Sequence, residues 1–279
     1  MIKYNITDIR RLLYLSIIIL LTFLCVLIAK ARTSIWASIP LLFTFSLFNF
    51  QMESLDLLFF NDFFLMIVGS IAIIVVSMHS NKYYEEIFVL LGSVLAFTSM
   101  FMVPLIVLSF PLIVALLYTS NGESCGKRFF KYTVAWGWGY AITMATKVLL
   151  SVCFVQSDRG LTQISHYLGN DKYTFVGRIS RIVEVWKSLF WCSEISRHLV
   201  IAIIVALVIF IVIKRRNSIN LLGKYWPVGI MLLFPAMWCF FCAGHSTHGW
   251  TVWNWSIAVF ALLGLLFKMC GFDGTEEKC

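Results

Sequence analysis

The sequence predicts an all-α protein whose helices cross a membrane several times. Hydrophobic residues make up 60% of the 279 residues and charged residues make up 13%, whereas soluble globular proteins carry about 25% charged residues. The mean hydropathy is correspondingly high, at +0.88. The apolar residues also gather in long runs that short polar links separate. Together these observations indicate a polytopic α-helical membrane protein.

About nine apolar runs predict the membrane segments of a single integral membrane domain over residues 1–279. In chain order they cover residues 12–29, 35–50, 57–79, 87–102, 103–118, 132–155, 199–213, 226–243 and 252–268. A helix needs roughly 20 residues to cross the hydrocarbon core, so several runs are too short for a full crossing. We therefore expect some segments to be short or broken. Pro104 and Pro111 favour breaks in the run 103–118.

The first run begins in the manner of a secretory signal peptide, with three basic residues in the first eleven positions. Its apolar stretch is longer than the roughly 7–15 residues of a signal-peptide core, so it predicts a transmembrane helix that is not cleaved. Nine full crossings would place the N-terminus outside, whereas the basic residues favour the inside. A re-entrant segment at 35–50 would reconcile the two.

The distribution of Lys and Arg orients the C-terminal half of the chain. The link 119–131 carries three basic residues and the link 214–224 carries four. Because cytoplasmic loops of membrane proteins are enriched in Lys and Arg, both links are expected in the cytoplasm. The alternation of segments then places the links 156–198 and 243–250 outside and the C-terminus in the cytoplasm.

The link 156–198 is the one long stretch between two predicted membrane segments. Within it, apolar residues recur at helical spacing on one face and charged residues occupy the other: Ile179, Ile182, Val183, Trp186, Leu189 and Phe190 against Arg178, Arg181, Glu184 and Lys187. This pattern predicts an external amphipathic helix that lies on the outer surface of the membrane.

The net charge of +8 would suggest nucleic acid as a partner if the protein were soluble. Here the Lys and Arg residues lie in links between apolar runs, so the predicted partners are membrane lipids with anionic headgroups, and no nucleic acid is expected. The eight cysteines lie mostly in or beside apolar runs and show no disulfide framework.

Two histidines stand out because lipid contact does not explain them. His245 and His248 lie three residues apart in the short link 243–250. Imidazoles there can bind an anion such as phosphate or act as an acid/base pair, or they can cap the two adjoining helices. Cys239 and Cys242 precede them at the same spacing, but residues three apart drift by about 60° per step on a helix, which argues against zinc. No metal site is predicted.

Four further charged residues are candidates for a site. Lys147 is a strong charge well inside a predicted span, where it can hold a lipid phosphate or pair with an acidic group, or its ammonium can reach the membrane interface. Glu53, Asp56 and Asp62 flank the start of the run 57–79. These carboxylates are weak candidates for a general base or for holding a divalent cation, with ordinary helix-end charges as the alternative. No cofactor-binding motif is present.

The span 132–155 contains the stretch Trp136-Gly-Trp-Gly-Tyr140. Small residues inside a span allow two helices to approach closely, so Gly137 and Gly139 predict tight packing. The aromatic side chains are expected to pack between helices or to lie in the membrane-interface belt.

The order of these features resembles that of a group of bacterial proteins. The run from Phe97 to Ile113 contains Pro104 and Pro111, the Trp-Gly stretch leads to Lys147, and an external amphipathic segment and His245-Ser-Thr-His248 follow. Over roughly residues 40–265 the chain resembles polytopic membrane proteins that look related to the C-type glycosyltransferase superfamily and are associated with surface polysaccharide.

The resemblance implies a glycosyltransferase-like protein of the bacterial cytoplasmic membrane that handles polyprenyl-phosphate-linked sugars at the outer face for cell-surface polysaccharide. It implies that Lys147, His245 and His248 hold phosphate. Any catalytic base would come from the three carboxylates Glu53, Asp56 and Asp62 or from upstream sequence. The alternative is a non-enzymatic transporter or flippase, or an accessory subunit, so whether the chain is an enzyme stays open. The absence of an internal repeat mildly favours the enzyme.

Two departures from the family pattern shape these expectations. Asn254 stands where the family has an arginine, so this chain lacks a guanidinium that could bind an anion through two parallel hydrogen bonds. The early external loop that carries the catalytic aspartate of C-type enzymes is not visible. The resemblance therefore implies that the chain is the C-terminal part of a longer protein of this kind, or a decayed copy.

Overall fold

The computed structural model describes residues 6–48, 57–79, 82–98, 104–120, 122–155, 173–191, 215–244 and 253–272, together with residues 162, 165, 166, 201, 202, 205 and 209. All regular elements within these residues are helices, which confirms the prediction of an all-α protein.

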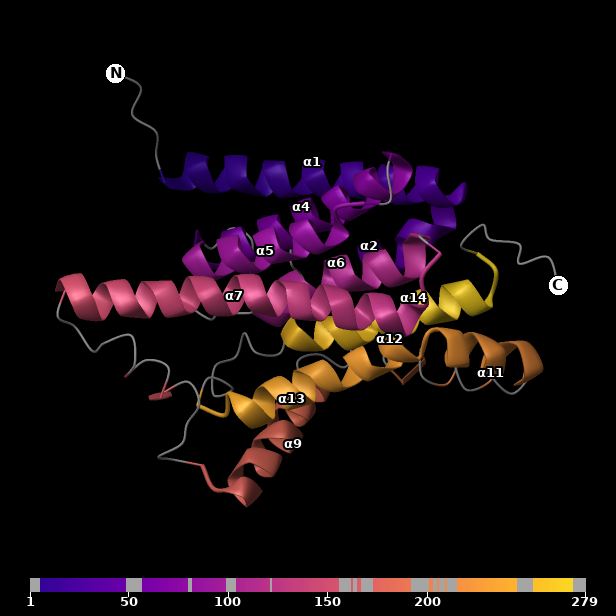
Figure 1. Cartoon of the computed structure of the whole chain (residues 1–279). Helices are drawn as coiled ribbons and strands as arrows, with labels where there is room; N and C mark the ends of the chain where they lie inside the picture. Colours follow the sequence, from indigo (N-terminus) through magenta and orange to yellow (C-terminus); the bar gives the residue numbers. More distant parts are fainter. Residues whose placement is uncertain are drawn as a thin grey trace.

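The helices form one elongated bundle (Figure 1). In chain order they are α1 (Ile6–Arg32), the 3-10 helix η1 (Ile35–Ser38), α2 (Ile39–Leu47), α4 (Leu57–His79), α5 (Tyr84–Thr98), α6 (Pro104–Tyr118), α7 (Cys125–Val155), α9 (Phe175–Trp191), α11 (Arg215–Lys224), α12 (Trp226–Ile230), the 3-10 helix η2 (Met231–Leu233), α13 (Phe234–Phe241) and α14 (Ser256–Met269).

Three of these helices are long and apolar enough to cross a membrane, namely α1, α4 and α7. Other apolar helices are shorter. α6, for example, has 15 residues, which at about 1.5 Å per residue falls well short of the roughly 30 Å hydrocarbon core. The chain is therefore a membrane-embedded helical protein that contains short segments. The number of about nine membrane segments stays a prediction, and most of the run 199–213 lies outside the described residues.

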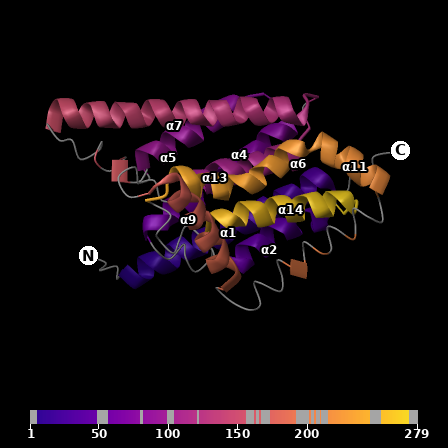
Figure 2. The ribbon, with the colours of Figure 1, turned by 90° about the horizontal axis from the view of Figure 1, so that it is seen from below.

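α6 lies at the centre of the bundle, in contact with α4, α5, α7 and α14 (Figure 2). All of its residues except Leu105 are buried. Pro111 lies inside this helix, which continues through it, so the predicted break at Pro111 is wrong. Pro104 begins the helix. At this position the N–H group of any residue would have no partner within the helix, so proline removes no hydrogen bond. At Pro111, close packing on all sides offsets the one hydrogen bond that proline removes.

α5 and α7 pack side by side at the edge of the bundle, closely enough for backbone contact (Figure 2). A Cβ atom on Gly92 would overlap the carbonyl oxygen of Trp136, and one on Gly139 would overlap that of Val89. The close approach predicted at Gly139 is therefore confirmed. At Gly137 an added Cβ would meet nothing within 4 Å, so the same prediction is wrong there. Gly92 is the partner that the sequence does not identify.

Several helix ends meet at one end of the bundle, at the right in Figure 1. They are the C-terminal ends of α1, α6 and α14, and the starts of α7 and α12. Ser34, after α1, donates from Oγ to the carbonyl oxygen of Phe272, after α14, at 2.6 Å. We call this the basic end, because both basic links, 119–131 and 214–224, reach it. The N-terminal end of α1 and the C-terminal end of α7 lie at the opposite end (Figure 1).

The predicted amphipathic segment contains helix α9, which packs against α13 (Figure 1). Arg178 donates from Nη1 to the carbonyl oxygen of Phe240 at 2.8 Å. Val185, which lies on the side of the helix that carries Arg178 and Arg181, is buried. On the predicted apolar face Ile179 and Val183 are exposed. The helix is thus observed where the spacing predicts it, and its position on the outer membrane surface stays a prediction.

Candidate anion-binding site

Basic side chains cover the C-terminal ends of several short helices. The last carbonyl groups of a helix have no partner within it, and where lipid excludes water they must find one in the protein. At the end of α5, Lys147 Nζ donates to the carbonyl oxygens of Ala96 at 2.9 Å and Phe97 at 3.2 Å. At the end of α13, Arg178 donates to Phe240. The positive charges also suit the negative end of each helix dipole.

The C-terminal end of α6 receives two arginines at the basic end. Arg128, in the first turn of α7, donates to the carbonyl oxygens of Ala115 and Thr119, the latter at 3.1 Å. Arg32, the last residue of α1, donates to the carbonyl oxygen of Leu117. Arg128 is only 4% exposed, and its Nε finds no hydrogen-bond partner within the described structure. This buried guanidinium therefore has a donor left for an anion or a water molecule.

A cavity of about 680 Å³ lies beside these arginines, and we call it the basic pocket. Five of its lining side chains are basic and one is acidic: Arg32, Lys127, Arg128, Lys224 and Lys268 against Glu123. The N-terminus of α7 also lines it, and the N–H groups of a helix N-terminus add partial positive charge. The pocket therefore has an excess of positive charge and several hydrogen-bond donors.

Two of these lysines approach the same aromatic ring. The Nζ atoms of Lys224 and Lys268 lie 5.7 Å and 5.1 Å from the ring centroid of Tyr225. Each ammonium gains from its cation–π contact, but two like charges near one ring repel each other. Lys268 is 8% exposed, so water screens this repulsion poorly. An anion in the pocket would offset it.

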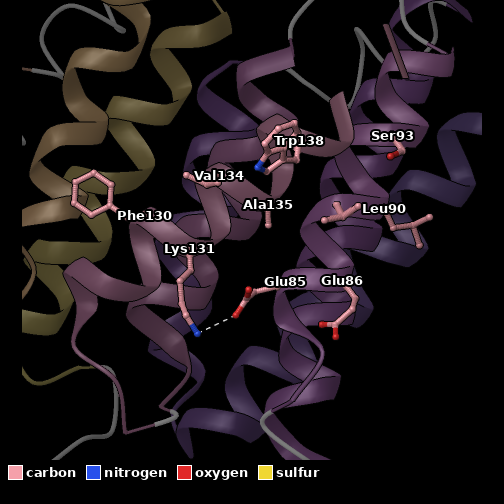
Figure 3. Close-up of a pocket in the computed structure, with 10 residues that line it drawn as sticks. Glu85, Glu86, Leu90, Ser93, Phe130, Lys131, Val134, Ala135 and Trp138 are labelled. Carbon is pink, nitrogen blue, oxygen red and sulfur yellow. Dashed lines mark ion pairs between the residues drawn. The ribbon is translucent and has the colours of Figure 1, made fainter. Parts of the chain in front are cut away.

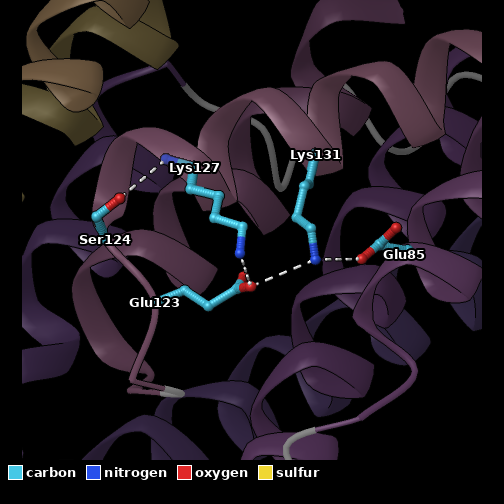
Figure 4. Close-up of polar contacts among 5 residues, drawn as sticks. All are labelled: Glu85, Glu123, Ser124, Lys127 and Lys131. Atoms are coloured by element: carbon cyan, nitrogen blue, oxygen red, sulfur yellow. Dashed lines mark hydrogen bonds and ion pairs between the residues drawn. The ribbon is translucent and has the colours of Figure 1, made fainter.

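Glu123 is held by two lysines of α7 (Figure 4). Its Oε1 lies 2.8 Å from Nζ of Lys127 and 3.4 Å from Nζ of Lys131. Lys131 also lies 2.9 Å from Oε1 of Glu85. The hydrogen bond from Lys127, helped by Lys131, lowers the pKa of Glu123 below its ordinary value. Glu123 is therefore ionised at neutral pH, and it suits an ion-pair role better than that of a proton donor.

This arrangement suits a phosphate group. Guanidinium and ammonium groups donate charge-assisted hydrogen bonds to phosphate oxygens, and a partly buried pocket strengthens them because water is limited. The acidic side chain in the wall is already neutralised by its two lysines. The geometry thus offers binding of an anion rather than a proton-transfer step.

Two of the sequence-predicted site residues lie at the opposite end of the bundle. Asp62 is buried within α4, at 1% exposure. Its neighbour Asn61 donates from Nδ2 to Oγ1 of Thr98 at 2.6 Å. Thr98 directly follows Ala96 and Phe97, whose carbonyl oxygens accept hydrogen bonds from Lys147. The structure therefore brings Asp62 and Lys147 to the same end of the bundle, away from the basic pocket.

The other predicted residues are not placed. Glu53, Asp56, His245 and His248 lie outside the described residues. Asn254 is fully buried directly before α14. Its side-chain amide finds no hydrogen-bond partner within the part of the chain that the structure describes.

The residues of the basic pocket are absent from the candidates that the sequence identifies. Basic residues in the links 119–131 and 214–224 predict topology, and nothing in the sequence assigns a role to Arg32 or Lys268. One feature of the sequence could have indicated the pocket: the two basic links are expected on the same side of the membrane, where their cations can come together. That α1 and α14 also end there depends on the fold. No protein-family model, no curated protein and no solved structure matches this chain.

Proposed function

We propose that this integral membrane protein binds the phosphate group of a lipid-linked substrate in the basic pocket. The observation that carries the proposal is the set of five basic side chains around one ion-paired carboxylate, with Arg128 and Lys268 almost fully buried. Buried cations cost free energy unless an opposite charge accompanies them. A lipid phosphate supplies several acceptor oxygens and negative charge, which is one unit in a diester such as a polyprenyl-phosphate-linked sugar and roughly two units in a monoester at neutral pH.

A lipid-linked phosphate suits the position of the pocket. The pocket opens at one end of a membrane-embedded bundle, and two exposed aromatic residues, Phe130 and Trp226, line it. Aromatic residues are enriched at the level of the lipid headgroups, where a lipid phosphate also lies. We place this end and the C-terminus in the cytoplasm, because the two basic links reach it.

The resemblance supports a more specific substrate, a polyprenyl-phosphate-linked sugar used for cell-surface polysaccharide in the bacterial cytoplasmic membrane. Transfer of such a sugar would require a carboxylate that activates the acceptor. Among the described carboxylates, Asp62 is the one buried in the bundle at the end where outer-face transfer is proposed. The resemblance implies that Lys147, His245 and His248 hold phosphate. For Lys147 this would be a second phosphate site, separate from the basic pocket, and it requires Lys147 to leave its carbonyl partners.

A transporter or flippase for the same lipid is the second candidate. The basic pocket lies at one end of the bundle, whereas Asp62 and Lys147 lie at the other. A protein that moves a lipid phosphate between leaflets can use polar groups at both ends, whereas a transferase needs them at one.

Binding of a polyprenyl phosphate to the full chain in lipid nanodiscs tests the proposal. Lys224→Gln and Lys268→Gln should each weaken binding by about tenfold or more, because a hydrogen bond to a charged group contributes about 1.5–3 kcal/mol. Lys82→Gln is the matched control, because Lys82 is exposed and lies outside the pocket lining. Equal binding of the uncharged polyprenol, or the same affinity in all three variants, would refute phosphate recognition.

Two assays separate the candidate functions. A carrier should move a labelled polyprenyl phosphate between the leaflets of reconstituted vesicles. A transferase should pass a labelled sugar from its polyprenyl phosphate to an acceptor while leaving the lipid in its leaflet. Binding without either activity would indicate an accessory subunit.

A further inference from the structure

A second cavity lies on the surface between α5 and α7, and we call it the α5–α7 groove (Figure 3). Its volume is about 810 Å³. Most of its lining is apolar, including Leu90, Val134 and Trp138, each more than half exposed. Charged residues line one end, where Lys131 pairs with Glu85, and Trp138 lies at the other end (Figure 3).

The close approach of the two helices explains the shape of this groove. Gly92 and Gly139 bring the backbones of α5 and α7 into contact, so small residues such as Ser93 and Ala135 lie along the seam. Large side chains stand on either side of the seam. An apolar channel that follows a helix pair on a lipid-facing surface suits a linear hydrocarbon chain.

The groove adjoins the basic pocket. Phe130 lines both cavities. Lys131 lines the groove and pairs with Glu123, which lines the pocket. The apolar part of the groove, its charged end with Glu85, Glu86 and Lys131, and the cation cluster of the pocket thus follow one another along α7. A lipid with a phosphate head and a long apolar tail has the same overall order of chemistry.

We infer that the α5–α7 groove holds the hydrocarbon chain of the lipid whose phosphate binds in the basic pocket. The inference rests on the proposed function and adds to it that the protein recognises chain length as well as the phosphate. The chain leaves the pocket past Phe130 and runs along Val134 toward Trp138. A helix of a partner protein on this surface would not account for the position of the groove next to the cation cluster, with Phe130 lining both cavities.

The test compares three ligands on the full chain: a long-chain polyprenyl phosphate, a ten-carbon isoprenyl phosphate and inorganic phosphate. The wild-type protein should bind the long-chain ligand at least about tenfold more tightly than the ten-carbon one, because each further buried methylene adds several-fold. Val134→Trp fills the groove from its exposed edge, so it should remove this difference and leave inorganic phosphate binding unchanged.

Val152→Trp is the matched control. Val152 is also exposed on α7, lies outside the groove lining and faces the same way, because 18 residues make about five turns. It should bind all three ligands as the wild type does. Thermal unfolding of both variants checks that they fold.

If Val134→Trp disturbs folding, a photo-crosslinking amino acid at position 134 gives the second measurement. It should capture the long-chain phosphate in preference to bilayer phospholipid. Equal affinity for long and short chains, equal effects of the two tryptophan variants, or capture of bilayer lipid or a protein instead would overturn the groove assignment while leaving the phosphate proposal intact. Failure of every phosphate ligand to bind would overturn both.

Discussion

The ammonium of Lys147 lies 2.9 Å from the carbonyl oxygen of Ala96, at the C-terminal end of α5. α5 has 15 residues, too few to cross a hydrocarbon core of roughly 30 Å. Its last carbonyl groups therefore need a partner within the protein. In the sequence Lys147 stands out as a binding residue, but in the structure it completes the hydrogen bonding of a short helix.

Lys147→Met should lower stability more than it lowers ligand binding. Two hydrogen bonds to a charged donor are lost, and the carbonyl groups of Ala96 and Phe97 lose that partner, which costs about 1–3 kcal/mol. Thermal unfolding in nanodiscs measures the change, with the exposed Lys82→Met as the control. Loss of polyprenyl phosphate binding at unchanged stability would instead assign Lys147 to the substrate.

Glu123→Gln should strengthen anion binding in the basic pocket. The substitution removes the negative charge in the wall and releases Lys127 and Lys131 from it. We expect the affinity for inorganic phosphate to rise by about three- to tenfold, which calorimetric titration would detect. Glu86→Gln is the control, because Glu86 lines the groove and not the pocket. A lower affinity would show that Glu123 helps to position the lysines.

The ion pairs of Glu123 should also make stability depend on pH. Because the folded state lowers the pKa of this carboxyl, the pairs stabilise the protein at pH values above the ordinary glutamate range. That contribution is lost as the pH falls through the lowered pKa. Acid unfolding of Glu123→Gln should therefore lack part of the pH dependence of the wild type. Identical acid transitions would show that solvent screens these pairs.

The contact between α5 and α7 should tolerate no added methyl group at its seam. Gly92→Ala and Gly139→Ala each place a Cβ against the backbone of the other helix, and overpacking of this kind costs about 1–3 kcal/mol. Gly137→Ala meets open space and should leave the melting temperature unchanged or raise it slightly. Similar melting temperatures for all three would mean that the helices can separate at little cost.

Asp62→Asn distinguishes a catalytic role from a structural one. If Asp62 activates the acceptor, the variant should bind polyprenyl phosphate normally and lose sugar transfer. The amide is nearly the same size as the carboxylate, so packing around this buried side chain is retained. Transport or polysaccharide production at wild-type levels would exclude the catalytic role. Glycan analysis of cells that contain normal amounts of the variant provides the measurement.

Hydropathy predicts many of these helices because segments that face lipid must be apolar. The runs 57–79 and 103–118 correspond closely to α4 and α6, since a buried or lipid-facing helix is apolar along its whole length. The prediction of a break at Pro111 is wrong, although proline inside a helix usually kinks or ends it because it lacks an N–H group. Dense packing around α6 keeps the helix continuous there, and such packing cannot be deduced from a single segment.

The site was harder to predict because it depends on where helices end. Arg32 and Lys268 are separated by more than two hundred residues and look like ordinary terminal charges of two membrane helices. They line one cavity because α1 and α14 end at the same place. Gly92 was missed for a similar reason, since its close neighbour on α7 is far away in sequence.

The pairing of α6 also has a consequence for biogenesis. Its final carbonyl groups accept hydrogen bonds from Arg32, which is synthesised earlier, and from Arg128, which is synthesised later. During synthesis, α6 can therefore meet Arg32 at once but remains incomplete until the first turn of α7 emerges. A translocon that released α6 into lipid before that point would release a helix with unpaired carbonyls. We expect α6 to remain at the translocon until the start of α7 has been inserted.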